Sequence, residues 1–316
     1  MTETGGKAMN TIGGCNCILV CLLIGTASLL SQDMYPVRQL TSDPALEGFP
    51  SWSPDGKAIV FSVYDMVDGV PVFGSRTISP EGGEPVGLTD FPTEHPQWSP
   101  DGRFIVFDAD TGAAINMMDA AGKNPHAFLP DSIHIYNGGL PCWSPDGARI
   151  AFKEGTTGAL YVYEVRTGRV TEIFRAGGLL PLPGCWSRHG GSILIALMDR
   201  TTRVSTIREI SPDGKQTRQV TGHRPGFHRF LALSPDGSLL VYGSLEEKKV
   251  GLWIMPAGGG SSLPLAVSPA YHNQCPAWSP DGKRLAFASG RSGQGDIYVM
   301  DLDVDRLRAE LESANK

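Results

Sequence analysis

Six segments of the chain repeat one short pattern, and this pattern decides the fold. They are PSWSPDGKAIVF (50–61), PQWSPDGRFIVF (96–107), PCWSPDGARIAF (141–152), GCWSRHGGSILI (184–195), LALSPDGSLLVY (231–242) and PAWSPDGKRLAF (276–287). The repeat serines stand at positions 53, 99, 144, 187, 234 and 279, so the period is 43 to 47 residues. A period of this length with short strands is typical of a β-propeller, in which each repeat forms one blade.

Each repeat contains the parts of a four-stranded blade. The innermost strand ends in Trp-Ser, and Pro-Asp-Gly then forms a tight turn, because Pro fixes φ, Asp bonds nearby backbone and Gly accepts positive φ. Three further strands follow, such as 284–287, 296–302 and, in other blades, 84–89. The repeat tryptophans are expected to fill the gaps between blades, and in the fifth blade Leu233 stands in that place.

The sixth repeat has no fourth strand of its own. At the other end of the chain, YPVRQLT (35–41) matches the fourth strands EPVGLT (84–89) and QTRQVT (216–221). We therefore predict an all-β, six-bladed β-propeller over residues 35–302, closed by the N-terminal strand, which removes a free sheet edge. Residues 303–316 are rich in Ala, Glu, Leu and Arg and predict a short helical tail.

Residues 1–34 read as a leader. Residues 18–31 form fourteen consecutive residues without a charge. A membrane-spanning helix needs roughly twenty apolar residues, whereas the core of a signal peptide needs about 7–15. We therefore expect a secretory leader and a periplasmic or secreted protein with no membrane span after its removal. An uncleaved leader would instead anchor the protein to the membrane.

Composition excludes several classes of protein. Charged residues make up 19% of the chain and apolar residues 41%, which argues against global disorder. The net charge of −6 gives no basic stripe for nucleic acid. Cys142, Cys185 and Cys275 follow the leader, and an odd number does not make a disulfide framework, so buried packing is expected for them.

The W-S-P-D-G-x-x-[IL]-[AV]-F pattern, followed by IYVMD (297–301), resembles the TolB-type β-propeller repeat over essentially the whole chain after the leader. The resemblance implies a protein of the cell envelope that assists an envelope complex. TolB itself has a separate α/β domain before its propeller. Only about thirty residues precede the first strand here, so the resemblance is expected to cover the propeller alone.

The binding surface of a propeller is usually the face that carries the loops between blades, around the mouth of the central channel. Residues four to seven positions before the repeat serines start the innermost strands, so side chains far apart in sequence can converge there. The candidate binding residues at these positions are Glu47, Glu94, His95, Asn137, His228, His272, Asn273 and Gln274. Histidines among them would make binding pH-dependent near pH ~6.5.

Two classes of function stay open. The first, which we favour, is a non-catalytic, monomeric binding module for a protein or a glycan, without a cofactor and without nucleic acid. The second is a metal-assisted lyase or hydrolase on a polysaccharide or small acidic substrate. It would use His95, His228 and His272 to hold a divalent metal in the central channel, with Gln274 or Glu94 completing the site. No nucleophile elbow, zinc-protease helix or phosphate loop is present in the sequence.

Overall fold

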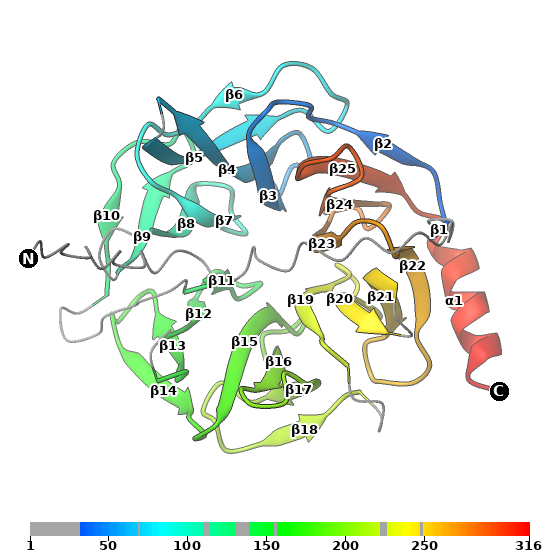
Figure 1. Cartoon of the computed structure of the whole chain (residues 1–316). Helices are drawn as coiled ribbons and strands as arrows, with labels where there is room; N and C mark the ends of the chain where they lie inside the picture. Colours follow the sequence, from blue (N-terminus) through cyan, green and yellow to red (C-terminus); the bar gives the residue numbers. More distant parts are fainter. Residues whose placement is uncertain are drawn as a thin grey trace, which may run out of the picture.

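Six β-sheets stand in a ring around a central axis in the computed structural model (Figure 1). The structure describes residues 32–68, 70–109, 114–129, 139–154, 157–221, 226–246 and 249–316. It confirms the six-bladed propeller that the repeats predict. The predicted leader, apart from its last three residues, and Asn137 lie outside the described residues.

Each blade is an antiparallel sheet whose strands follow the chain outward from the axis. Blade one contains β3 (Leu46–Trp52), β4 (Ile59–Val67), β5 (Val70–Ile78) and β6 (Val86–Gly87). Blade two contains β7 (Glu94–Trp98), β8 (Phe104–Ala109), β9 (Ala114–Asp119) and β10 (His126–Ala127). Blade three contains β11 (Cys142–Trp143), β12 (Arg149–Lys153), β13 (Leu160–Glu164) and β14 (Val170–Phe174).

The remaining blades repeat this order. Blade four contains β15 (Leu179–Trp186), β16 (Ile193–Asp199), β17 (Ser205–Ile210) and β18 (Thr217–Gln219). Blade five contains β19 (Arg229–Leu233), β20 (Leu239–Glu246), β21 (Lys249–Pro256) and β22 (Leu263–Ser268). Blade six contains β23 (Asn273–Trp278), β24 (Arg284–Ser289) and β25 (Asp296–Asp301).

The N-terminal segment closes the ring, as the sequence predicts. Strand β2 (Val37–Gln39) pairs antiparallel with β25, with Val37 opposite Met300, and becomes the fourth strand of blade six. A second short strand, β1 (Gln32–Asp33), adds to the outer edge of blade five. Asp33 accepts two hydrogen bonds from the guanidinium of Arg291, at 2.7 and 3.1 Å. Residues 32–39 therefore join the last two blades.

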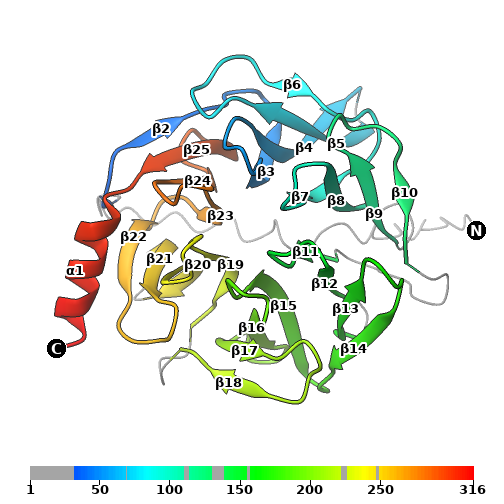
Figure 2. The same ribbon diagram turned by 180° about the vertical axis from the view of Figure 1, so that it is seen from behind.

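The predicted helical tail is α1 (Val304–Ala314). Asp303 caps its N-terminus by accepting a hydrogen bond from the Arg306 backbone N–H. The buried side chains of Leu307 and Leu311 belong to the core shared by blades five and six. Figures 1 and 2 both place α1 beside β22 on the outside of the ring. Among the described residues, no helix is both long and apolar enough to cross a membrane.

The repeat serine and aspartate build the inner turn together in five of the six blades. In blade two, Ser99 Oγ donates to Asp101 Oδ1 at 2.6 Å, Asp101 accepts from the Arg103 N–H, and Ser99 Oγ accepts from the Phe104 N–H. The serine hydrogen bond, first, and the backbone hydrogen bond hold the pKa of Asp101 below its usual range. The same contacts recur around Asp55, Asp146, Asp236 and Asp281.

The repeat tryptophans seal the gaps between blades. The indole N–H groups of Trp52, Trp186 and Trp278 donate to backbone carbonyls of Ala277, Cys142 and Ala232, each on the preceding blade, at 3.0 to 3.1 Å. Cys142, Cys185 and Cys275 are free thiols, buried or half-buried, as the packing interpretation expects. Burial raises the pKa of Cys142 and Cys185, so both thiols stay protonated at neutral pH.

Candidate functional site

The innermost strands bend into the central channel at one repeated position. The residue four places before the repeat serine has a positive φ in five of the six blades, although none of the five is glycine: Phe49 (53°), His95 (49°), Leu140 (46°), Phe230 (53°) and Cys275 (53°). A register shift of the ladder spans this residue in blades one, two, five and six. Such bulges re-aim side chains, and here all five residues line the channel cavity.

Aromatic side chains meet at the axis because of this bend. The ring of Phe49 packs edge-on against His95, with centroids 4.0 Å apart, and against Phe230, with centroids 5.5 Å apart. The guanidinium of Arg229 lies 4.9 Å from the centre of the Phe230 ring. It also donates to Gln274 Oε1 at 3.1 Å. We call Phe49, His95, Arg229, Phe230 and Gln274 the axial cluster.

Within the axial cluster, His95 forms a buried pair with the carboxylate of Asp108. Its Nδ1 lies 2.7 Å from Asp108 Oδ1, and both side chains are buried. The other oxygen of Asp108 accepts from the Gly139 N–H. Burial acts to raise the pKa of Asp108, but His95, the Gly139 N–H and Lys153 outweigh it and hold that pKa below its usual range. Asp108 is therefore a carboxylate that orients the imidazole, an arrangement that also serves general bases.

Three predicted residues lie six places before the repeat serine and contact neighbouring strands instead. His228 donates its backbone N–H to Ser205 of blade four, and its Nδ1 lies 2.9 Å from Ser244 Oγ. Asn273 donates from Nδ2 to the Ala266 carbonyl of blade five at 3.0 Å. Glu47 accepts from Thr41 Oγ1. All three are buried, and none belongs to the described residues that line the channel cavity.

Glu47 is unusual electrostatically. Burial raises the pKa of Glu47 to about 7. The nearby Asp296 carboxylate adds to this effect, and the hydrogen bond from Thr41 opposes it without cancelling it. Burial likewise raises the pKa of Asp296. The nearest guanidinium nitrogen to Glu47 Oε1 belongs to Arg76, at 3.9 Å, and that atom bonds Asp43 more closely. The seam between blades six and one thus contains two carboxyl groups that resist ionisation.

The predicted set therefore divides. His95 and Gln274 belong to the axial cluster, whereas Glu94 is buried at the start of β7. His272 is half-buried, and its backbone carbonyl accepts a hydrogen bond from the Gly290 N–H at 3.0 Å. Within the described ranges, no group of three or more His, Cys, Asp and Glu side chains is arranged to hold a metal ion.

Sequence reasoning missed Phe49 and Phe230, which line the channel cavity, and Arg229, which contacts the Phe230 ring. The signal was available for the two phenylalanines, because aligning the repeats on their serines puts both in the same column as His95. Arg229 could not be found this way, since its role comes from contacts with Phe230 and Gln274 that depend on the bend.

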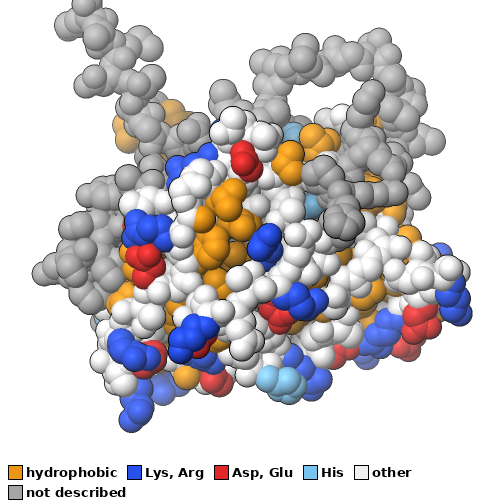
Figure 3. All heavy atoms as spheres, turned by 90° about the horizontal axis from the view of Figure 1, so that it is seen from below, with side chains coloured by type: hydrophobic (Ala, Val, Ile, Leu, Met, Phe, Trp, Pro, Cys, Tyr) orange, Lys and Arg blue, Asp and Glu red, His pale blue; other side chains and the backbone are white. Residues whose placement is uncertain are grey.

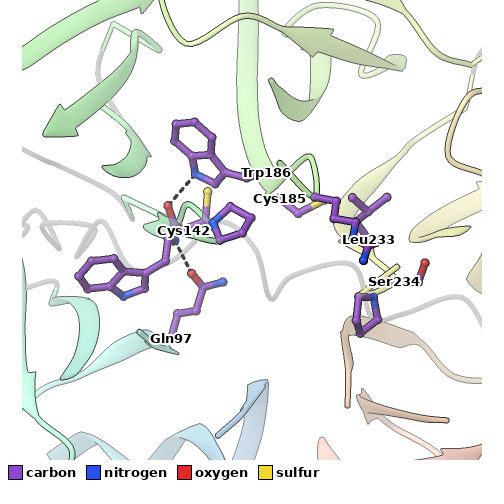
Figure 4. A pocket seen from close by; sticks show the side chains of 10 residues that line it. Gln97, Cys142, Cys185, Trp186, Leu233 and Ser234 are labelled. Carbon is purple, nitrogen blue, oxygen red and sulfur yellow. Dashed lines mark hydrogen bonds between the residues drawn. The ribbon is translucent and has the colours of Figure 1, made fainter. Parts of the chain in front are cut away.

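The channel contains two adjoining cavities. One, of about 300 Å³, reaches from the axial cluster to Pro235 and Trp278. The other, of about 220 Å³, lies towards the Pro-Asp-Gly end and is shown in Figure 4, where Gln97, Cys142 and Trp186 face Leu233 and Ser234. On the side of the molecule seen in Figure 3, described Lys and Arg side chains are interspersed with Asp and Glu and do not form a basic stripe.

Comparison with known proteins gives few relatives by sequence and many by fold. No family model matches the chain. The chain is 26% identical over 147 residues to the uncharacterized protein Atu1656 of Agrobacterium fabrum, which covers 46% of this chain and about half of that protein (47%). The stretch is too short to show a family.

Solved structures of similar shape include a putative TolB and two enzymes. A putative TolB from Agrobacterium tumefaciens has a TM-score of 0.61 and 20% identity, covering 84% of this chain and 96% of that one. The oligogalacturonate lyase VPA0088 from Vibrio parahaemolyticus has a TM-score of 0.57 and 14% identity, covering 88% and 96%. A gluconolactonase from Xanthomonas campestris has a TM-score of 0.62 and 13% identity, covering 85% and 89%.

These identities are low, so they show a shared fold and leave the activity open. The repeat pattern, the six blades and the fold likeness agree. The chain is a six-bladed β-propeller similar to the propeller of TolB.

Proposed function

We propose that this chain is an exported, monomeric propeller that binds a protein or a glycan at the inter-blade mouth of its channel and catalyses no reaction. The axial cluster is the observation that carries this proposal. It brings together the half-buried rings of Phe49 and Phe230, the buried ring of His95, an arginine and an amide from blades one, two, five and six. Aromatic and arginine side chains supply most of the energy at the centres of binding interfaces.

The contacts of the other polar residues support binding over catalysis. His228 and Asn273 form hydrogen bonds with neighbouring strands of blades four and five. Groups held in this way stabilise the ring and are poorly placed to touch a substrate. We therefore propose binding that requires no metal ion.

Site-specific photocrosslinking in cells tests the proposal. A photoreactive amino acid is placed at Gln274, in the axial cluster, and as a control at Arg166, an exposed residue of the β13–β14 turn at the opposite face. We expect discrete adducts with one protein or glycan from position 274 and none from 166. The Arg229→Gln variant should weaken the same adduct. Equal adducts from both positions would contradict a specific binding face.

The second candidate function is catalysis. The observation in its favour is the His95–Asp108 pair beside the channel cavity, together with fold likeness to an oligogalacturonate lyase and a gluconolactonase. Purified protein should be assayed for cleavage of oligogalacturonate and hydrolysis of gluconolactone, with and without added Mn²⁺. Turnover that is lost in His95→Gln, with the fold intact, would establish catalysis over simple binding.

A further inference from the structure

Two departures from the repeat stand side by side at the seam between blades four and five. Blade five carries Leu233 where the other five blades carry tryptophan, and blade four carries Arg188 where the other five carry proline. Both residues line the same cavity of about 220 Å³ at the Pro-Asp-Gly end of the channel. The cavity borders this seam and extends across the channel to Gln97 of blade two and Trp143 of blade three.

The cavity is open here because Leu233 replaces the repeat tryptophan of blade five. At the preceding seam, Trp186 covers the innermost strand of blade three and donates to the Cys142 carbonyl at 3.0 Å. The equivalent surface on blade four surrounds Cys185, which lines the cavity (Figure 4). Leu233 lines the same cavity beside Cys185. A leucine side chain is smaller than an indole, so part of the seam stays unfilled.

The walls of the cavity are mainly apolar. Trp143, Trp186 and Leu233 supply rings and aliphatic surface. Two polar atoms of the lining residues have partners: Gln97 Oε1 accepts from the backbone N–H of Trp143 at 2.7 Å, and Ser234 Oγ donates to Asp236 Oδ1 at 2.6 Å. Such walls favour the apolar body of a small ligand.

Arg188 supplies the single charge among the residues that line this cavity. Its stem packs over the next turn, because a Cβ placed on Gly237 would lie 3.1 Å from the Arg188 Cβ. Its Nη1 donates to the Asp236 carbonyl at 3.2 Å, which holds the guanidinium near the rim. Among the described residues, no carboxylate forms a salt bridge with Arg188, and the Asp236 carboxylate pairs with Arg308.

We propose that this cavity binds a small organic acid, with its apolar body between Trp186 and Leu233 and its carboxylate on Arg188. Guanidinium groups bind carboxylates through short, charge-assisted hydrogen bonds. The ligand enters from the Pro-Asp-Gly face, opposite the axial cluster. This cavity adjoins the one beside the axial cluster, and the two share lining residues such as Leu233. The proposal rests on Arg188 and Leu233 and does not depend on the proposed binding of a protein or glycan.

Calorimetric titration with small aryl and alkyl acids tests the proposal. The probes are phenylacetate, 4-phenylbutyrate and octanoate, each compared with its neutral amide. Wild type should bind at least one acid at least tenfold more tightly than the matching amide. Arg188→Met should remove this preference and leave the affinity for the amide unchanged. Arg166→Met, which removes an exposed arginine of the same face outside the cavity, should behave as wild type.

Leu233→Trp restores the repeat residue and should fill the cavity. We expect it to abolish binding of acid and amide alike and to raise the midpoint of thermal unfolding. No binding of any probe to wild type would overturn the proposal, as would an unchanged acid preference in Arg188→Met. A Leu233→Trp protein that unfolds at a lower temperature than wild type would also overturn it, because the seam would then have no room for an indole.

Discussion

The ring of Phe49 lies 5.5 Å from the ring of Phe230, although blade six separates the two blades that carry them. Both residues have a left-handed backbone, with φ of 53°. A left-handed conformation costs a non-glycine residue about 1–2 kcal/mol. The bend is nevertheless present in five blades, and at Phe49, His95 and Phe230 ring contacts across the axis offset the local strain.

Replacing Phe49 separates the ring contact from the backbone strain. Phe49→Ala and Phe49→Gly both lose the aromatic contacts, but only glycine relieves the left-handed conformation. We expect the glycine variant to be more stable than the alanine variant by about 1 kcal/mol in urea unfolding. Phe73 is the matched control, because it is half-buried and is absent from the residues with positive φ. There glycine should be the less stable of the two, and the same order at Phe49 would contradict the strain argument.

The two tryptophans of blades three and four differ in one hydrogen bond. Trp186 donates its indole N–H to a carbonyl, whereas the buried indole N–H of Trp143 has no hydrogen-bond partner among the described residues. Trp186→Phe should therefore lower the free energy of unfolding by about 1 kcal/mol more than Trp143→Phe. Urea unfolding of both variants measures the difference. Equal losses would mean that packing alone, and not the hydrogen bond, determines how much these tryptophans contribute to the free energy of unfolding.

Much of the fold was predictable because its signals are local. The Ser-Pro-Asp-Gly turns form through contacts within six residues, such as Ser99 Oγ with the Asp101 side chain and the Phe104 N–H. The strand 35–41 was recognisable because it copies the fourth strand of other blades. Strand β1 was not predicted, since its two residues pair with β22 only through the tertiary fold.

The candidate site was less predictable, because side chains four and six places before the repeat serine lie in different surroundings. His95 is four places before its repeat serine and lines the channel, whereas His228 is six places before its own and bonds Ser205 and Ser244. The sequence places both near the start of an innermost strand. Only the bend at the fourth position decides which of them reaches the axis.

Closure by the N-terminal segment predicts a sharp effect of truncation. A chain that begins at residue 42 lacks β1 and β2 and the buried side chains of Tyr35 and Leu40. We expect it to lose roughly 4 kcal/mol of stability from the two side chains and to expose the β25 edge. Size-exclusion chromatography should show self-association that is absent from a chain beginning at residue 32. A monomeric truncated protein of unchanged stability would show that the ring does not need this closure.

Glu47 predicts a pH dependence of stability with a defined sign. Burial raises its pKa from 4.5 to about 7 in the folded state, so its contribution is fully present below pH 4.5 and is lost as the pH rises through about 7. Glu47→Gln cannot ionise and keeps an acceptor for Thr41, so its unfolding free energy should exceed that of wild type above pH 7 by as much as about 3 kcal/mol. Urea unfolding between about pH 5 and pH 8 measures this. Glu172→Gln is the control, because the hydrogen bond from Arg175 holds the pKa of Glu172 below its usual range and the group stays ionised throughout. This variant should keep the wild-type dependence of the unfolding free energy on pH. If the unfolding free energy of Glu47→Gln changed with pH as that of wild type does, Glu47 would ionise normally in the folded ring.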